Sequence, residues 1–318
     1  MNKDPHIFRF CGLTAILSVT ALSCTSKETV LPPFLTHLLA ITSRAVSLEE
    51  TTVNYYIFNR KDGLLDSCGS LGNQDSGQAR LISRSGEKTA VLTGGLPDDK
   101  LDYTYVLSME NLSELHCSLT EEDSGSPVLC GVIDFDAGGA GNYSIELTPL
   151  MAKVVLRSLR VDFSGTDYGK EQLKNARAYL INVNGLCPLL PGDDANSRDV
   201  LNQGKLDAAS LASMRNPSLL LSDKAEGAEL YCYPGQGGDA LGQNTTRLVV
   251  EGQLAGNTCY WSFDVGNGKV ERGHCYIFDI TLTRAGWPEP DIAAGVCAQQ
   301  LQIVLDDWKE EGDEIIDY

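Results

Sequence analysis

The segment Thr52-Val-Asn-Tyr-Tyr-Ile-Phe58 is rich in β-branched and aromatic residues, and the turn signal Lys61-Asp-Gly63 follows it closely. A short run of this composition that ends at a glycine turn is typical of a β-strand. The same pattern recurs along the chain. It is found at Tyr103–Leu107, Tyr143–Leu147, Ala152–Leu156, Ala178–Val183, Thr246–Val250 and Cys275–Leu282. These runs predict an all-β protein.

Spacing and turn signals narrow the architecture. The strand-like runs recur at roughly 8–12-residue intervals, which is typical of antiparallel β-sandwiches. Regular amphipathic helices do not separate them, which argues against an α/β fold. Gly266-Asn-Gly268 predicts a further hairpin-type turn. Residues 197–224 carry Leu, Ala and Ser at loosely helical spacing, and they predict a short helical excursion.

The length of 318 residues suits two domains of about 150 residues each. A hydrophobic content of 42% is enough to build their cores. The stretch Gly165-Thr-Asp-Tyr-Gly169 is the predicted boundary. We therefore expect one β-sandwich over residues 45–165 and a second, with the helical excursion, over residues 166–318.

The N-terminus predicts export. Lys3 and Arg9 precede the charge-free apolar run Phe10–Leu22, which is too short to span about 30 Å of hydrocarbon and reads as a signal peptide over residues 1–23. The run ends in Ala21-Leu-Ser-Cys24, which resembles a bacterial lipobox and predicts lipidation of Cys24. The alternative is a soluble secreted protein that is cut near Cys24. Residues 24–44 then form a leader.

The net charge of the chain limits the classes of partner that it can bind. The chain has 25 Lys and Arg against 43 Asp and Glu, a net charge of −18, which argues against a nucleic-acid partner or an anionic lipid surface.

Eight of the ten cysteines are left for the exported protein once Cys11 of the signal peptide and the lipidated Cys24 are set aside. They either form up to four disulfides or serve as small buried apolar residues. With four histidines and no CxxC pair, the sequence predicts no metal site.

Two segments imitate catalytic or metal-binding motifs. Glu122-Asp-Ser124-Gly-Ser-Pro resembles the nucleophile loop of trypsin-like proteases, but no histidine stands in a matching motif. Asp134-Phe-Asp136 resembles the start of a calcium loop, but Ile145 stands where an acidic residue should close it. We therefore expect no catalytic, cofactor or metal site, and we do not expect an enzyme.

The order of segments resembles the fimbrillin superfamily of Bacteroidetes, the subunits of lipoprotein-derived surface fimbriae. Three parts of the sequence carry this resemblance, and the first is Ser43-Arg44-Ala45-Val46 followed by the predicted strand Thr52–Phe58. The second joins Tyr103–Leu112 to Leu147-Thr-Pro-Leu-Met-Ala-Lys153. The third runs from Thr246–Gly252 through Glu271–Tyr276 and Leu282–Asp291 to Asp307-Trp308.

This resemblance implies two tandem transthyretin-like domains, lipoprotein export to the outer membrane, and cleavage between Arg44 and Ala45 by an Arg-directed protease. It also implies assembly with other fimbrial subunits by strand donation, for which we consider the alternating C-terminal run Leu301, Ile303 and Leu305. The chain would then be a stalk or tip subunit that serves adhesion. Two alternatives stay open, an outer-membrane glycan-binding lipoprotein and a fimbrial anchor subunit in which Arg44 is not cut.

Overall fold

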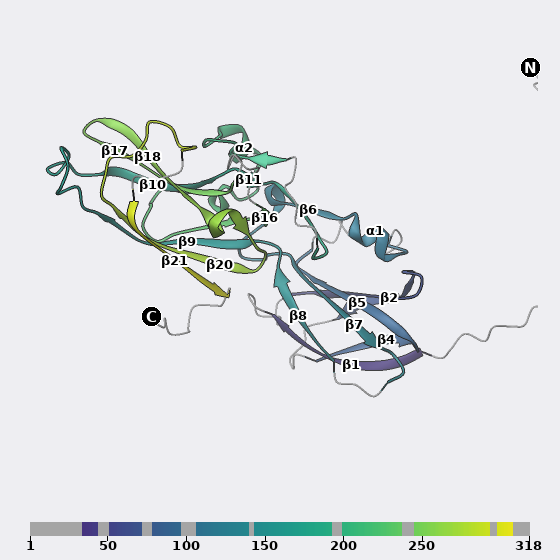
Figure 1. The fold of residues 1–318 in the computed structure, drawn as a ribbon. Helices are drawn as coiled ribbons and strands as arrows, with labels where there is room; N and C mark the ends of the chain where they lie inside the picture. Colours follow the sequence, from purple (N-terminus) through teal and green to yellow (C-terminus); the bar gives the residue numbers. More distant parts are fainter. Residues whose placement is uncertain are drawn as a thin grey trace, which may run out of the picture. The chain divides into compact units, whose positions relative to one another are not determined.

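The computed structural model describes residues 34–43, 51–71, 78–96, 106–139, 143–192, 199–236, 245–292 and 298–307. Its first sheet has seven strands in the order β3-β2-β5-β7-β8-β1-β4 (Figure 1). Their bounds are β1 Phe34–Ser43, β2 Val53–Asn59, β3 Leu65–Leu71, β4 Gln78–Arg84, β5 Glu87–Gly94, β7 Leu129–Asp136 and β8 Tyr143–Pro149.

The first sheet surrounds its own apolar core. Alternate side chains of its strands are buried together, because successive residues of a strand face opposite sides. This inner cluster contains Leu39 and Ile41 of β1, Ile57 of β2, Leu92 of β5 and Leu147 of β8. Strands β3 and β4 are the two ends of the sheet order, and hydrogen bonds between Asp66 and Arg84 join them. The sheet therefore curls until its two edges meet.

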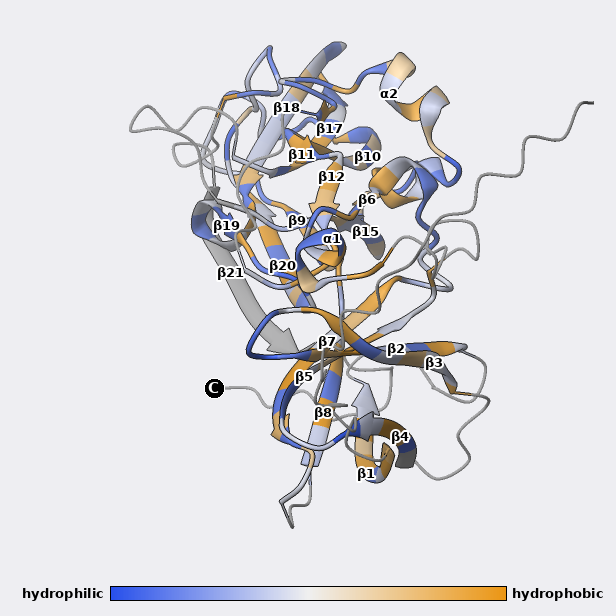
Figure 2. Cartoon of the chain, turned by 90° about the vertical axis from the view of Figure 1, so that its right-hand side faces the viewer, coloured by the Kyte–Doolittle hydropathy of each residue, from blue (hydrophilic) through white to orange (hydrophobic). Residues whose placement is uncertain are grey.

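Two four-stranded sheets follow, in the orders β14-β10-β17-β18 and β15-β9-β20-β21. The first contains β10 Lys174–Ile181, β14 Leu221–Ser222, β17 Arg247–Leu254 and β18 Asn257–Asp264. The second contains β9 Ala152–Val161, β15 Ala228–Cys232, β20 His274–Leu282 and β21 Ala298–Asp307. Their apolar faces share one core, which includes Leu180, Leu248 and Trp261 from one sheet and Leu156 and Phe278 from the other. Figure 2 shows orange, hydrophobic stretches along β9 and β20.

Shorter elements complete the described chain. Three two-stranded ladders pair β6 His116–Ser118 with β12 Leu186–Pro188, β11 Val183–Asn184 with β13 Val200–Leu201, and β16 Gly235–Gln236 with β19 Lys269–Val270. The helices are α1 Met109–Ser113 and α2 Ala208–Ser213, with 3-10 turns at η1 Leu119–Glu121, η2 Pro217–Leu219 and η3 Val265–Gly268. Asp207 caps α2 by accepting hydrogen bonds from the N–H groups of Ala209 and Ser210.

The all-β prediction is confirmed, and α2 and η2 lie in the predicted helical excursion of residues 197–224. Strands are found at five of the six further predicted runs, whereas Tyr103–Tyr105 lies outside the described residues and Val106 and Leu107 are not in a strand. The assignment to transthyretin-like tandem domains stays a prediction.

Two details of the prediction are wrong. β1 pairs with β8 in parallel, and β9 pairs with β20 in parallel, so the sheets are not purely antiparallel. About 100 residues separate the members of each pair, and such long connections allow parallel pairing. The tight hairpin turn is Ala255-Gly256 between β17 and β18, where both residues have positive φ. The turn Gly266-Asn-Gly268 instead leads from β18 into β19, which pairs with β16.

The sequence predicts a boundary between two domains at residue 165. The described residues all belong to one compact unit. β9, which the sequence analysis assigns to the first domain, shares a sheet with β15 and β20. The boundary at residue 165 stays a prediction.

Candidate functional site

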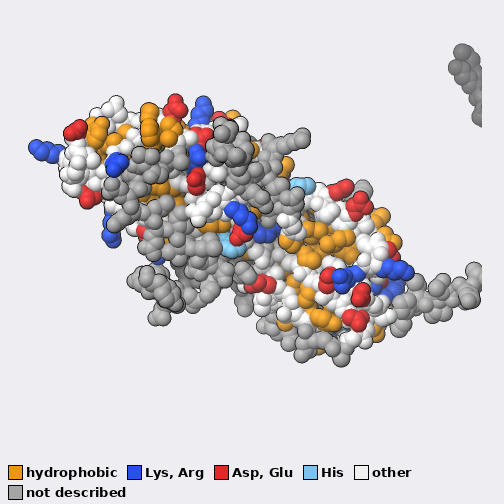
Figure 3. All heavy atoms as spheres, viewed as in Figure 1, with side chains coloured by type: hydrophobic (Ala, Val, Ile, Leu, Met, Phe, Trp, Pro, Cys, Tyr) orange, Lys and Arg blue, Asp and Glu red, His pale blue; other side chains and the backbone are white. Residues whose placement is uncertain are grey.

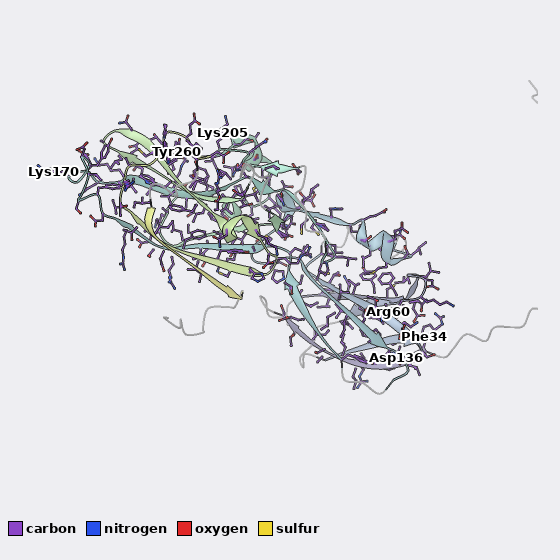
Figure 4. All side chains as sticks on the ribbon, in the orientation of Figure 1. Phe34, Arg60, Asp136, Lys170, Lys205 and Tyr260 are labelled. Carbon is purple, nitrogen blue, oxygen red and sulfur yellow. The ribbon has the colours of Figure 1, made fainter. Side chains whose placement is uncertain are left out.

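The predicted leader contains a strand of the first sheet. β1 lies between β8 and β4 in the sheet order, and Figures 1 and 2 both draw it beside β4. Its residues Leu39–Ser43 pair in parallel with Tyr143–Leu147 of β8. Its residues Phe34–Ala40 pair antiparallel with Gln78–Arg84 of β4. Figure 4 labels Phe34 at the start of this strand. Both backbone edges of β1 are therefore used within the sheet.

The two faces of β1 differ sharply. Leu39 and Ile41 are each 3% exposed and belong to the inner core of the sheet, whereas Leu38, the residue before Leu39, is 59% exposed. Ile145 of β8 and Leu81 of β4 belong to the same inner core. Removing β1 would therefore expose an apolar groove and leave unpaired edges on both β8 and β4, which are ready to pair with another strand.

His37 is the third inward-facing position of β1. Its Nε2 lies 3.0 Å from the hydroxyl oxygen of Ser83, and its ring packs edge-on against Phe135 with 5.5 Å between the ring centroids. Burial lowers the pKa of His37 below its usual range, and the positive charge of Lys88 lowers it further. The strand therefore places a partly buried, titratable ring beside the inner core.

A charged cluster joins the two ends of the first sheet. The Asp66 carboxylate of β3 accepts hydrogen bonds from the backbone N–H of Arg84 at 2.7 Å and from its Nη1 at 2.9 Å. It also lies 3.2 Å from Nζ of Lys88, and both of these side chains are nearly fully buried. Burial alone would raise the pKa of Asp66, but these donors outweigh burial and lower it. We call the contacts of Asp66, Arg84 and Lys88 the seam.

The C-terminal strand occupies a sheet edge. β21 pairs antiparallel with β20, from His274 opposite Asp307 to Leu282 opposite Ala298. It is the last strand in its sheet order, so one strand alone holds it by backbone pairing within the described chain.

The segment before β21 is fixed independently of it. Trp287 exchanges two 2.9 Å backbone hydrogen bonds with Tyr260 of β18, and Trp261 Nε1 donates to the Arg284 carbonyl at 3.0 Å. Nη1 of the buried Arg247 lies 2.7 Å from the Asp291 carboxylate, and Nε of Arg247 lies 2.7 Å from that of Asp264. We call these contacts of residues 284–291 the latch. Figure 4 labels Tyr260 on β18.

The predicted processing residues are not placed. Cys24, Arg44 and Ala45 lie outside the described residues, and β1 ends at Ser43, directly before Arg44 in the sequence. The sequence assigns residues 24–44 to a leader, but it does not reveal the polar contacts of His37, the seam and the latch. These contacts join residues far apart in the sequence, so local spacing carried no signal for them.

The two segments that resemble a protease loop and a calcium loop make hydrogen bonds within the fold. Glu122 is buried and accepts a hydrogen bond from the Tyr233 hydroxyl at 2.8 Å. Asp134 accepts one from the Thr89 hydroxyl at 2.6 Å and lies 3.4 Å from Arg60. Within the described ranges, no cluster of His, Cys, Asp and Glu could hold a metal ion.

Basic and acidic side chains are interspersed on the face that Figure 3 displays. None of the helices in the described ranges is long and apolar enough to cross a membrane.

Comparison with solved structures identifies the fold. A fimbrilin (FimA) from Porphyromonas gingivalis matches with a TM-score of 0.65 and 15% sequence identity, over 89% of this chain and 99% of that one. A fimbrial assembly protein from Parabacteroides distasonis matches with a TM-score of 0.51 and 10% identity, over 86% and 96%. The tip fimbrial protein Mfa3 from Porphyromonas gingivalis, with a C-terminal truncation, matches with a TM-score of 0.54 and 11% identity, over 86% and 100%.

These likenesses confirm, at the level of the fold, the resemblance that the sequence indicates. No family model matches the chain, and no curated protein matches it either. At identities of 10–15% the similarity is in fold rather than in sequence.

Proposed function

We propose that this chain is a fimbrillin-type structural subunit of a bacterial cell-surface fimbria that serves adhesion. It is exported as a lipoprotein, acylated at Cys24 and anchored in the outer membrane until assembly. The observation that carries the proposal is the position of β1, a leader strand that completes the core of a sheet and pairs with both flanking strands. The described fimbrial proteins of the same fold support the role, and as structural proteins they fit a chain without catalysis.

Cleavage between Arg44 and Ala45 would separate β1 covalently from the rest of the sheet. β2 begins only at Val53, so the new N-terminus would follow the cut without disturbing β2. The leader would then be held by pairing and packing alone, and its departure would open the groove between β8 and β4.

A strand from another subunit would refill the groove. β1 and β21 are each ten residues long. The inward positions His37, Leu39 and Ile41 are spaced by two, and the sequence of β21 repeats this spacing with Leu301, Ile303 and Leu305. An incoming strand satisfies the open backbone edges and buries its alternate side chains, which is the physics of β-strand addition. Because the contact is heterologous, repetition extends a filament.

Arg44→Ala tests the proposal. We expect the variant to accumulate as an uncut, Cys24-acylated lipoprotein that is absent from filaments, whereas wild-type filaments contain subunits that begin at Ala45. The matched control is Arg160→Ala, which removes an exposed arginine of β9, a strand of a different sheet from β1. Mass spectrometry of the N-termini and denaturant-resistant ladders on gels provide the readouts.

Normal assembly of Arg44→Ala, or filament subunits that begin at Cys24, would contradict cleavage at this site. A wild-type protein that stays monomeric and is retarded by polysaccharide in a native gel would instead favour the glycan-binding alternative.

A further inference from the structure

Two cysteines face each other across a short antiparallel ladder. The pairing of β6 with β12 places Cys117 directly opposite Cys187, and both side chains are buried. The structure carries both as thiols. Among the seven described cysteines, this is the one pair that any strand register brings together. Cys130, for example, lies opposite Thr93 and Thr148.

The ladder geometry suits a covalent bond. Directly opposed residues of an antiparallel pair have Cα atoms about 4.5–5.5 Å apart, within the range of about 4.4–6.8 Å that disulfides span. Backbone hydrogen bonds hold the register on both sides of the pair. Leu119 donates to the Gly185 carbonyl at 2.9 Å, and Leu189 donates to the Leu115 carbonyl at 2.9 Å.

A cation lies beside one of the sulfur atoms. Nη2 of Arg272 is 3.7 Å from Sγ of Cys187 and donates to the Pro188 carbonyl at 3.2 Å. Nη1 of Arg272 donates to the Leu189 carbonyl at 3.2 Å. The guanidinium therefore fixes the backbone that follows Cys187 and holds this residue in its place opposite Cys117.

We propose that Cys117 and Cys187 form a disulfide that joins β6 to β12 in the exported protein. This inference rests on the export contained in the proposed function, because disulfides form and persist outside the cytoplasm. The oxidant is a protein disulfide of the thiol-oxidase class. The Cys187 thiolate attacks it and forms a mixed disulfide, and the Cys117 thiolate then displaces the oxidase sulfur. The two cysteines lose two protons and two electrons, and the oxidase gains a dithiol.

The bond would close a loop of about 70 residues, a length at which cross-linking strongly restricts the unfolded chain. β6 lies between β5 and β7 of the first sheet in the sequence, and β12 lies between β10 and β17 of the second half. Because both sulfur atoms are buried, oxidation belongs to folding rather than to the finished protein.

Peptide mapping without reduction tests the bond. The full chain is expressed with its export signal, its thiols are blocked with N-ethylmaleimide in denaturant, and trypsin is used with a Glu-specific protease. Cleavage at Glu121 separates Cys117 from Cys130. We expect one cross-linked species that joins residues 115–121 to residues 178–198. Alkylation of both cysteines, or linkage of either to another cysteine, would overturn the inference.

Thermal unfolding provides the second measurement. Cys117→Ala, Cys187→Ala and the double variant should all lower the Tm of the oxidised protein by a similar amount, about 5–15 °C, because each removes the same cross-link. Reductant should lower the wild-type Tm likewise. The control Cys259→Ala, opposite Gly252, should stay sensitive to reductant. Additive losses in the two single variants, with a wild-type Tm that ignores reductant, would contradict the bond.

Cell fractionation separates the two hypotheses. A protein found at the outer membrane with both thiols alkylated overturns the disulfide and leaves the fimbrial role standing. A protein found in the cytoplasm overturns the export on which both proposals depend.

Discussion

His37 is a polar side chain on the inner side of a β-sheet, and its neighbours make protonation of its ring less favourable. Its ring packs on Phe135 and meets the Ser83 hydroxyl, and Lys88 adds a positive charge nearby. A neutral imidazole tolerates these surroundings, whereas an imidazolium would be a poorly solvated charge beside another cation.

We predict that docking of the leader weakens in acid. The docked pKa of His37 is lowered, so the undocked strand binds protons more readily. The stability of docking is therefore fully present above about pH 6.5, the usual histidine pKa, and falls as the pH drops from there towards the lowered pKa. Hydrogen exchange of β1 amides in the uncut protein at pH 7.5 and 5.5 measures the stability of docking. His37→Gln should make this stability less dependent on pH, and an unchanged pH dependence in this variant would mean that other groups cause it.

At the scale of elements, β1 offers a matched pair of leucines. Leu39 is buried at 3% exposure, and its neighbour Leu38 is exposed at 59%. Leu39→Ala should destabilise the uncut protein by about 2–4 kcal/mol, and Leu38→Ala by less than about 0.5 kcal/mol. After cleavage and loss of the leader, neither variant should alter the filament. Urea unfolding of the uncut protein and of filaments measures the effect of each variant before and after the leader is lost. A weaker filament in Leu39→Ala would mean that β1 remains in the assembled subunit.

The second element with a testable role is β21. Deleting residues 297–318 removes it but leaves the latch, in which Arg247 and Trp261 hold residues 284–291. We expect a folded monomer that cannot extend a filament. Deleting residues 308–318 alone, which follow the last residue of β21, should preserve assembly. If the longer deletion unfolds the protein in circular dichroism, β21 is an integral strand, and the chain is better assigned as a tip or anchor.

At the scale of the whole molecule, the leader should act as an inhibitor of its own assembly. A synthetic peptide of residues 34–43 added to cleaved subunits should compete for the groove and lower the rate of filament growth in proportion to its occupancy. The same peptide with Leu39→Asp should not, because a carboxylate cannot be buried in that core without a partner. Light scattering follows the growth, and equal effects of both peptides would exclude specific competition.

The sequence was informative where the physics is local. Thr52–Phe58 became β2 within one residue, and the turn at Gly63 has the positive φ that favours glycine. Alternation and turn chemistry act between neighbours, so a single chain reveals them. The parallel pairing of β1 with β8 was not foreseen, because partners about 100 residues apart share no local pattern.

The candidate site likewise combines a feature that the sequence reveals with contacts that it does not reveal. The sequence places Leu39 and Ile41 in a leader, and the structure buries both. The sequence did not indicate that Ser83 and Phe135 would receive His37, or that Asp66 would meet Arg84 and Lys88. Such contacts are set by how the sheet curls, which is a property of the assembled strands.

The seam has a consequence for the kinetics of growth. When β1 leaves, β4 loses its only strand partner in the described sheet, yet Asp66 still ties it to β3 through the backbone N–H of Arg84. A vacant site that keeps its width needs no refolding before it accepts a new strand. Elongation should then be limited by encounter, with a rate that is first order in free subunits and shows no plateau from a slow conformational step. Asp66→Asn, which weakens the tie, should introduce that plateau.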